Sequence, residues 1–224
     1  MPYTDNGDGT YTFIYEGSEV TIEALFVPLA AAPEMPFLDV KATDWFYDYV
    51  KYMYDHGLMV GTSEDEFSPG LMSSRAMIVT VLWRMVGSPA ATGTNSFTDL
   101  TADWYMDAVQ WAVGNGVTNG VSATSFAPNA PVTREQLATF LYRFAEFMGY
   151  DTTKKSDLSG YADSGSISDF AKDAMAWANA MDIITGESDT TLNPKGDSTR
   201  AVLATVLTRF CEAYDVFAED DLAA

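Results

Sequence analysis

Residues 131–136 read PVTREQ and stand just before a long run of apolar residues at helical spacing. A threonine at the N-cap with a glutamine three residues later predicts a capping box, which satisfies backbone groups that are otherwise unpaired at a helix start. Near-copies occur as SSRAM at 73–77 and STRAV at 198–202. Helix capping explains the hydroxyl residue of each copy, but it does not explain the arginine that follows. The hydroxyl residues are Ser74, Thr133 and Thr199.

The stretch belongs to a unit that is present three times without gaps between its landmarks. An aspartate and an aromatic residue open each copy, and a glycine follows seventeen residues after the aspartate. An arginine stands fourteen residues after the glycine, and a second arginine stands nine residues further on. The landmarks are Asp44-Trp45, Gly61, Arg75 and Arg84; then Asp103-Trp104, Gly120, Arg134 and Arg143; then Asp169-Phe170, Gly186, Arg200 and Arg209.

Each copy is predicted to fold as helix, loop, helix. In the first helix the apolar residues follow the helical period from the opening aromatic residue onward, as Trp104, Ala108, Trp111 and Ala112 do in the second copy. About a dozen polar, Gly and Pro residues then form a loop around one apolar anchor. The residues expected to end the first helices in the left-handed conformation are Gly57, Gly116 and Asp182.

The predicted fold class is mainly α, because a two-helix unit buries its apolar stripe only against other copies. The copies span 37–88, 97–149 and 161–213. Neither end copy has an obvious polar cap, which favours a closed pseudo-threefold trimer of repeats over an open rod. Residues 214–224 form an acidic C-terminal tail.

The first 36 residues alternate in polarity around a Gly-rich turn and predict a β-hairpin-like segment followed by a linker. The spacing of Asp5, Asn6 and Asp8 lacks the register and the closing glutamate of a calcium loop, so a turn is favoured and no metal is expected. The segment is similar to the ending of the β repeats of bacterial surface proteins.

The net charge of −20 argues against nucleic acid and anionic membrane surfaces as partners. No stretch approaches the roughly 20 apolar residues that span a bilayer. Cys211 lies in an apolar helical pattern, so we expect a buried small side chain and not a nucleophile.

The repeated elements resemble the S-layer homology (SLH) domain, whose motif is a Thr-Arg-Ala-Glu-like tetrapeptide at the start of the second helix. The resemblance covers about residues 37–212. It implies a helical pseudotrimer, monomeric and without cofactor, that binds bacterial secondary cell-wall polysaccharide, often one with pyruvate ketals on N-acetylmannosamine. It also implies an extracellular location at the cell wall, where such modules anchor proteins non-covalently. The first and third copies read SRAM and TRAV and lack the acid of the motif.

Six of the 12 lysines and arginines occupy the two repeated arginine positions. A cation in the first turn of a helix opposes the helix dipole, which points to a local use such as binding a carboxylate together with the amides of that turn. We therefore assign Arg75, Arg134 and Arg200 to ligand binding, with Arg134 first and Arg200 last; an inter-repeat salt bridge is the alternative. The adjacent hydroxyl residues are assigned to the same candidate site, namely Ser74, Thr133 and Thr199. The second arginine points to the opposite side of its helix and is expected to pair with an acid of a neighbouring copy.

Trp45 and Trp104 open the first helices and are expected either to stack on a sugar face or to begin the core stripe. Trp111 and Trp177 lie mid-stripe and are expected in the core. Gly61 and Gly120 are expected to form tight turns, with close approach of the backbone to ligand as the second option.

Two other functions compete with polysaccharide binding. An enzyme is disfavoured: Asp44 and Asp48 are spaced like a carboxylate pair, but His56 is the one histidine and has no counterpart in the other copies. A structural module that forms lattice contacts without binding glycan remains the alternative.

Overall fold

A computed structural model describes residues 3–5, 10–15, 18–23, 35–91 and 94–217. The chain divides into an N-terminal unit up to Glu34 and a helical unit that begins at Met35. In the first unit, β1 (Tyr3–Asp5), β2 (Thr10–Tyr15) and β3 (Ser18–Glu23) pair antiparallel in the order β1-β2-β3. Residues 6–9, most of the predicted linker and the end of the acidic tail lie outside the described residues.

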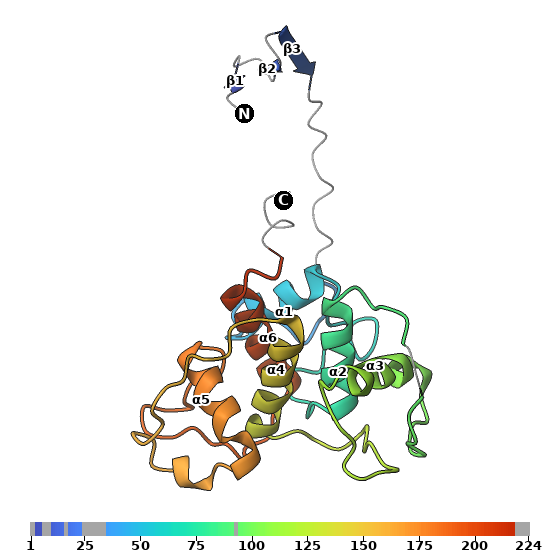
Figure 1. Cartoon of the computed structure of the whole chain (residues 1–224), viewed down its shortest axis with the longest axis vertical. Helices are drawn as coiled ribbons and strands as arrows, with labels where there is room; N and C mark the ends of the chain where they lie inside the picture. Colours follow the sequence, from blue (N-terminus) through green and yellow to red (C-terminus); the bar gives the residue numbers. More distant parts are fainter. Residues whose placement is uncertain (1–2, 6–9, 16–17, 24–34, 92–93, 218–224) are drawn as a thin grey trace. The chain divides into compact units, whose positions relative to one another are not determined.

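The helical unit contains two main helices for each repeat, as predicted (Figure 1). Short 3-10 turns, Ser164–Ser166 and Asp169–Ala171, precede the first helix of the third repeat. The helices are α1 (Tyr47–Asp55), α2 (Arg75–Met85), α3 (Asp103–Gly114), α4 (Arg134–Met148), α5 (Lys172–Ala180) and α6 (Arg200–Ala213).

The second helix of each repeat packs against the first helix of the next one. The closest pairs are α2 with α3, α4 with α5, and α6 with α1, so the last pair joins the end of the repeat series to its beginning (Figure 1). Bulky side chains fill the space between the helices. The largest fully buried ones are Trp177, Tyr105, Phe67, Phe126, Phe144 and Phe210.

Backbone hydrogen bonds also close a ring where the three second helices begin. The Ser73 amide donates to the Ser198 carbonyl at 2.7 Å, the Ser198 amide to the Val132 carbonyl at 3.0 Å, and the Val132 amide to the Ser73 carbonyl at 3.1 Å. These three residues occupy equivalent positions in the repeats. Each repeat thus contacts both of the others through its backbone.

The predicted helix ends agree with the structure. Gly57 and Gly116 adopt φ of 66° and 72° after α1 and α3, and Asp182 adopts 57° after α5. The capping box at the start of α4 is present, and the Thr133 amide donates to Gln136 Oε1 at 3.1 Å.

The predicted phase of the first-helix stripe is wrong at its first position. Trp45 lies before α1 and Phe170 before α5, and both are exposed. In α3 the buried stripe begins at Tyr105 and not at Trp104, which is half exposed and lines a groove together with residues of α2. Trp111 and Trp177 are buried, as expected.

Candidate functional site

Three grooves lie between the repeats and are built in the same way. The loop and second helix of one repeat form the wall, the next repeat contributes the opening aromatic residue, and the preceding repeat contributes its first-turn arginine. Groove A is lined by Gly61, Arg84, Trp104 and Arg200; groove B by Gly120, Arg143, Phe170 and Arg75; groove C by Gly186, Arg209, Trp45 and Arg134.

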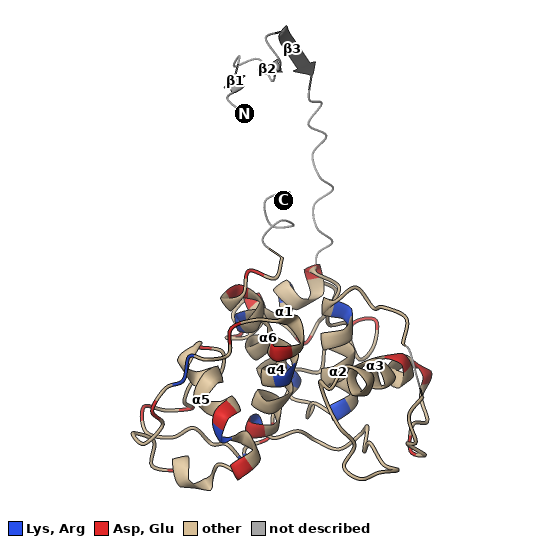
Figure 2. Ribbon diagram, in the orientation of Figure 1, with Lys and Arg blue, Asp and Glu red and all other residues tan. Residues whose placement is uncertain are grey.

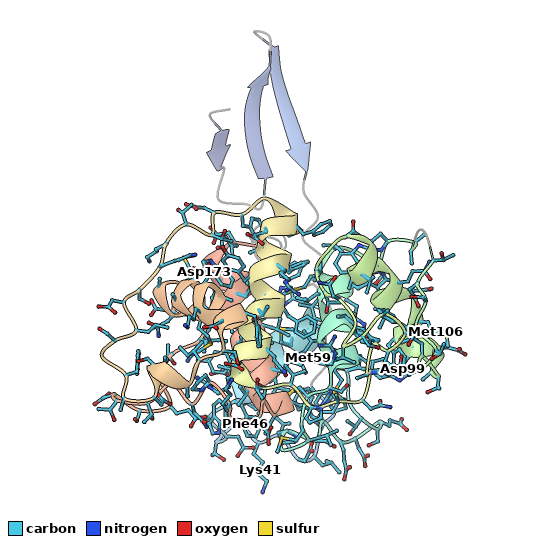
Figure 3. The ribbon with its side chains drawn as sticks, turned by 60° about the horizontal axis from the view of Figure 1, so that its bottom comes forward. Lys41, Phe46, Met59, Asp99, Met106 and Asp173 are labelled. Atoms are coloured by element: carbon cyan, nitrogen blue, oxygen red, sulfur yellow. The ribbon has the colours of Figure 1, made fainter. Side chains whose placement is uncertain are left out.

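The grooves have volumes of about 390, 490 and 350 Å³ for A, B and C, within the range of sites that hold small organic ligands. Met59, which is labelled in Figure 3, is buried and lines groove A. The helix α2 has an arginine near each end, Arg75 at its start and Arg84 in its last turn, and its ribbon is therefore blue near both ends (Figure 2).

The first-turn arginines hold adjacent repeats together. Arg200 donates from Nε to the Phe67 carbonyl at 2.7 Å and from Nη2 to the Val60 carbonyl at 2.6 Å. Arg134 makes the same pair of bonds with Leu192 and Thr185. Arg75 does so with Phe126 and Asn119. These bonds use two of the five guanidinium donors, which leaves three for a ligand.

Burial is the main electrostatic influence on these arginines. It lowers the pKa of Arg200 to about 10, against the opposing field of Asp39, so the guanidinium remains charged at neutral pH. Burial also lowers the pKa of Arg75 and of Arg134. A positive charge with few water contacts interacts strongly with an incoming carboxylate.

The amides of the first helical turn are not available to a ligand, contrary to our expectation. The Arg200 amide donates to the Leu71 carbonyl at 2.8 Å, and the Ala201 amide donates to the Pro69 carbonyl at 3.0 Å. The loop of the adjacent repeat therefore occupies the helix start. Any anion in the groove would rely on the side chains.

The second arginine of each helix faces a different groove from the first, as its spacing predicted. The expected pairing with an acid of a neighbouring copy is wrong for two of these arginines: Arg84 donates to the Leu58 carbonyl at 2.9 Å, and Arg209 to the Thr185 hydroxyl at 3.3 Å, both within the same repeat. Ring closure brings a first arginine from one repeat beside a second arginine from another. Arg143, for example, lies near enough to Arg75 to help lower its pKa, after burial.

The aromatic residues present their rings to the grooves. Trp45 is 65% exposed, Trp104 50% and Phe170 56%, although each makes groove contacts. Large apolar rings with this exposure are suited to stacking on a ligand. This exposure argues against a core role for Trp45 and Trp104.

The groove glycines are required by close packing. A Cβ at Gly61 would lie 2.2 Å from the Ser63 carbonyl oxygen, and one at Gly120 would lie 2.4 Å from the ring of Phe97. The tight turn that the sequence predicts at these positions is thus enforced by the loop itself.

The S-layer homology domain matches residues 36–76, 96–138 and 160–201, together more than half of the chain. The chain belongs to the S-layer homology family. It is 35% identical over 193 residues to an endoglucanase of Bacillus sp. (strain KSM-635), covering 83% of this chain and 20% of that protein. It is 32% identical over 211 residues to the surface-layer 125 kDa protein of Lysinibacillus sphaericus, covering 92% and 17%. The chain therefore spans about a fifth or less of the length of these relatives.

SLH domains are cell-surface anchoring modules and not catalytic ones, so the chain belongs to a protein of the cell surface or cell wall. In the described part of the chain, each helix falls short of the length or apolar character needed to cross a membrane. The same residues include no group of three or more His, Cys, Asp or Glu placed to hold a metal ion.

Each SLH repeat also contains an aspartate that holds its loop, a role that the sequence alone did not reveal. Asp39 accepts from the amides of Phe67 and Ser68 at 2.8 and 2.7 Å. Asp99 and Asp163 bind the equivalent amides of their repeats. Burial raises the pKa of Asp99, but hydrogen bonds from the Ser125 hydroxyl and the loop amides outweigh it and lower the pKa overall.

The interface between the second and third SLH repeats contains an additional buried carboxylate. Glu135 accepts from the amide and the hydroxyl of Ser168, both at 2.9 Å, and pairs with Lys195 at 2.5 Å. Ala76 and Ala201 occupy the equivalent positions. The sequence shows that the second copy alone has an acid at this position, but it does not indicate which residues that acid contacts.

Proposed function

We propose that the three SLH repeats bind an acidic secondary cell-wall polysaccharide in the grooves between them and so attach a protein non-covalently to the bacterial surface. The observation that carries the proposal is the composition of the grooves. In a chain with a net charge of −20, each groove combines two arginines with an exposed aromatic ring. A guanidinium with free donors recognises a carboxylate, and an aromatic face stacks on a sugar ring.

We further propose a carboxylated ligand such as a pyruvate ketal of N-acetylmannosamine. Its carboxylate would bind between the two arginines, and the ring of Trp104 or Trp45 would cover the sugar. The caps Ser74, Thr133 and Thr199 stand beside the arginines and contribute by orienting them. Gly61 and Gly120 let the loop make the tight turn that forms the groove wall beside the ligand.

The relatives fit an attachment role that is independent of the attached protein. A similar segment is present in an endoglucanase and in a surface-layer protein, and in each it accounts for a fifth of the length or less. We propose a monomer in which the three repeats form a closed pseudo-threefold unit, preceded by the tail of a β module.

Sedimentation of the chain with purified cell walls tests the proposal. The chain should bind untreated walls and lose binding after the polysaccharide is chemically removed. Replacing the three groove rings together, Trp45→Ala with Trp104→Ala and Phe170→Ala, should weaken binding by roughly tenfold or more, if stacking on each ring contributes about 1–3 kcal/mol as it does for nucleic-acid bases. Leu38→Ala is the matched control, because Leu38 is 76% exposed and lies outside the three grooves.

Equal binding to walls with and without polysaccharide would contradict the proposal. Concentration-dependent assembly of the chain without any glycan would instead favour the alternative of a lattice-forming structural module. Analytical ultracentrifugation distinguishes this outcome from the expected monomer.

A further inference from the structure

The three grooves differ at the residue that follows the groove glycine. This residue is Thr62 in groove A, Val121 in groove B and Glu187 in groove C. Among the described residues that line grooves A and B there is no Asp or Glu, whereas Glu187 lines groove C. Groove C therefore contains a negative charge of its own beside its two arginines.

The carboxylate of Glu187 is held toward the first-turn arginine of groove C. One oxygen, Oε1, lies 3.9 Å from Arg134 Nε, and the other, Oε2, accepts from Asn193 Nδ2 at 3.0 Å. The Glu187 amide donates to the Thr191 carbonyl at 2.9 Å, which fixes the backbone at this point. The side chain is 48% exposed, so it stands at the groove surface where a ligand would enter.

The equivalent pair of positions is neutral in the other two grooves. In groove A the Thr62 hydroxyl bonds the Ser68 hydroxyl at 2.6 Å, and in groove B the two positions are Val121 and Ala127. The loop aspartates do not create the same difference. Each first-turn arginine is attracted electrostatically by one loop aspartate. The pairs are Asp39 with Arg200, Asp99 with Arg75, and Asp163 with Arg134.

We propose that Glu187 is an internal competitor for carboxylated ligands, so that such ligands bind in grooves A and B and are excluded from groove C. An incoming carboxylate must either displace Glu187 from Arg134 or lie beside it as a like charge, and both cost free energy. The inference rests on the proposed function, because it concerns which grooves accept the acidic glycan. It also reverses the sequence-based ranking, since Arg134 lies in the closed groove and Arg200 in an open one.

The indole N–H signals of Trp104 and Trp45 report separately on grooves A and C in two-dimensional ¹H–¹⁵N NMR spectra. Trp104→Phe and Trp45→Phe assign the two signals. The probe is the methyl glycoside of 4,6-pyruvylated N-acetylmannosamine, and the same glycoside without pyruvate is the neutral control. With the wild-type chain, the Trp104 signal should shift at probe concentrations roughly tenfold or more below those that shift the Trp45 signal.

Variants of the loop pair then test the cause. Glu187→Thr with Asn193→Ser installs the groove A pair in groove C and should bring the Trp45 titration to the concentrations of Trp104. Glu187→Gln keeps the size and removes the charge, and it should restore most of this response. The reciprocal change, Thr62→Glu with Ser68→Asn, should suppress the Trp104 response; Ser68 has a φ of 58°, which asparagine tolerates well.

Each outcome decides a separate question. Equal shifts of both indole signals in the wild type, or a groove C that stays closed in Glu187→Gln, would overturn the role of Glu187 while leaving polysaccharide binding intact. Silence of both signals in the wild type and in every variant would overturn this inference, whereas the proposed function is decided separately by sedimentation with cell walls. An equal response to the neutral glycoside would show that the grooves do not read the carboxylate, and would also reject the inference.

Discussion

Arg200 donates to two backbone carbonyls of the first repeat and at the same time lines groove A. Its side chain therefore contributes to folding and is positioned for binding. The recurrence of the arginine in the sequence indicated a special role, for which ligand binding was preferred to an inter-repeat salt bridge. The structure adds a second reason, because an arginine at this point satisfies acceptors on a loop from another repeat.

Arg200→Ala should lower the free energy of unfolding by about 3 kcal/mol, because the buried Phe67 carbonyl and the partly buried Val60 carbonyl both lose a charged donor. Urea unfolding followed by tryptophan fluorescence measures this loss. Arg84→Ala is the matched control in the same groove: it removes one bond to the Leu58 carbonyl and should cost about 1 kcal/mol. Equal effects of the two substitutions would contradict the anchoring role of Arg200.

A binding test by Arg134→Ala alone is consequently ambiguous. A substitution that removed only a ligand contact would leave the thermal midpoint unchanged, but Arg134 is 8% exposed and bonds the Leu192 and Thr185 carbonyls. We now expect its midpoint to fall. The aromatic residues and the residue after the groove glycine offer cleaner tests of binding, because they are exposed.

Glu135 makes stability dependent on pH at a single interface. Burial opposes its ionisation, but the hydrogen bonds from Lys195 and Ser168 outweigh that effect and lower its pKa. A carboxyl group whose pKa is lower in the folded chain stabilises the fold above its usual pKa of about 4.3. This contribution is lost as the pH falls through the folded-state pKa.

Glu135→Gln should therefore unfold more easily than the wild type at pH 7, by about 1–3 kcal/mol, and the difference should shrink as the pH approaches 3. Urea midpoints across this range measure it. Glu64→Gln, at an exposed position of a loop, serves as control and should follow the wild type. A constant difference at all pH values would show that the charge of Glu135 does not stabilise the interface.

At the level of the elements, the loop of each repeat is the part that most constrains the groove. A buried apolar anchor, an aspartate that accepts loop amides, and a glycine beneath an aromatic ring fix its shape. The first-turn arginine of another repeat then binds the anchor carbonyl. The loop therefore acts as a rigid wall, which suits a site that must hold a ligand without rearranging.

Substitution of two glycines of the first loop tests whether close packing or only backbone flexibility requires a glycine there. Gly61→Ala should cost about 1–3 kcal/mol, because its Cβ would meet the Ser63 carbonyl oxygen at 2.2 Å and the Phe37 ring at 2.7 Å. Gly70→Ala should be nearly neutral, since nothing lies within 4 Å of a Cβ there. Thermal unfolding of the two variants compares them directly. A similar loss for both would mean that the Gly61 contacts are not limiting.

The sequence predicted the elements better than their contacts. The helix caps and the left-handed residues follow from local chemistry, so Thr133, Gly57 and Asp182 were predictable. The position of Trp104 was not, because a shift of one residue in helical phase decides between core and surface. The pairing of Arg84 with Arg200 in one groove was also inaccessible, since the two residues come from different repeats and meet only when the ring closes.

On the scale of the whole helical unit, the three interfaces are equivalent in kind and depend on one another. Each second helix lacks its main partner unless the next repeat is present, and the ring of backbone bonds at Ser73, Val132 and Ser198 requires all three. No repeat is stabilised by its own two helices alone. We therefore expect the unit to fold as a single cooperative structure.

Unfolding of the helical unit should show one transition, with coincident curves from far-ultraviolet circular dichroism and from tryptophan fluorescence. A fragment of residues 35–149 leaves α1 without α6 and α4 without α5, so it should lose most of its helical signal. Circular dichroism of the fragment measures this. A fragment that keeps two thirds of the signal and melts cooperatively would show that the repeats fold independently.

Because α6 packs against α1, the order in which the repeats follow one another along the chain does not determine which surfaces meet. A circular permutant that begins with the second repeat, continues through the third and ends with the first preserves every neighbour relation. It requires only a new connection between the end of α6 and the start of α1, together with a cut between α2 and α3. The contacts between the repeats form a closed cycle although the chain is linear, so a chain that starts at a different repeat can form the same contacts.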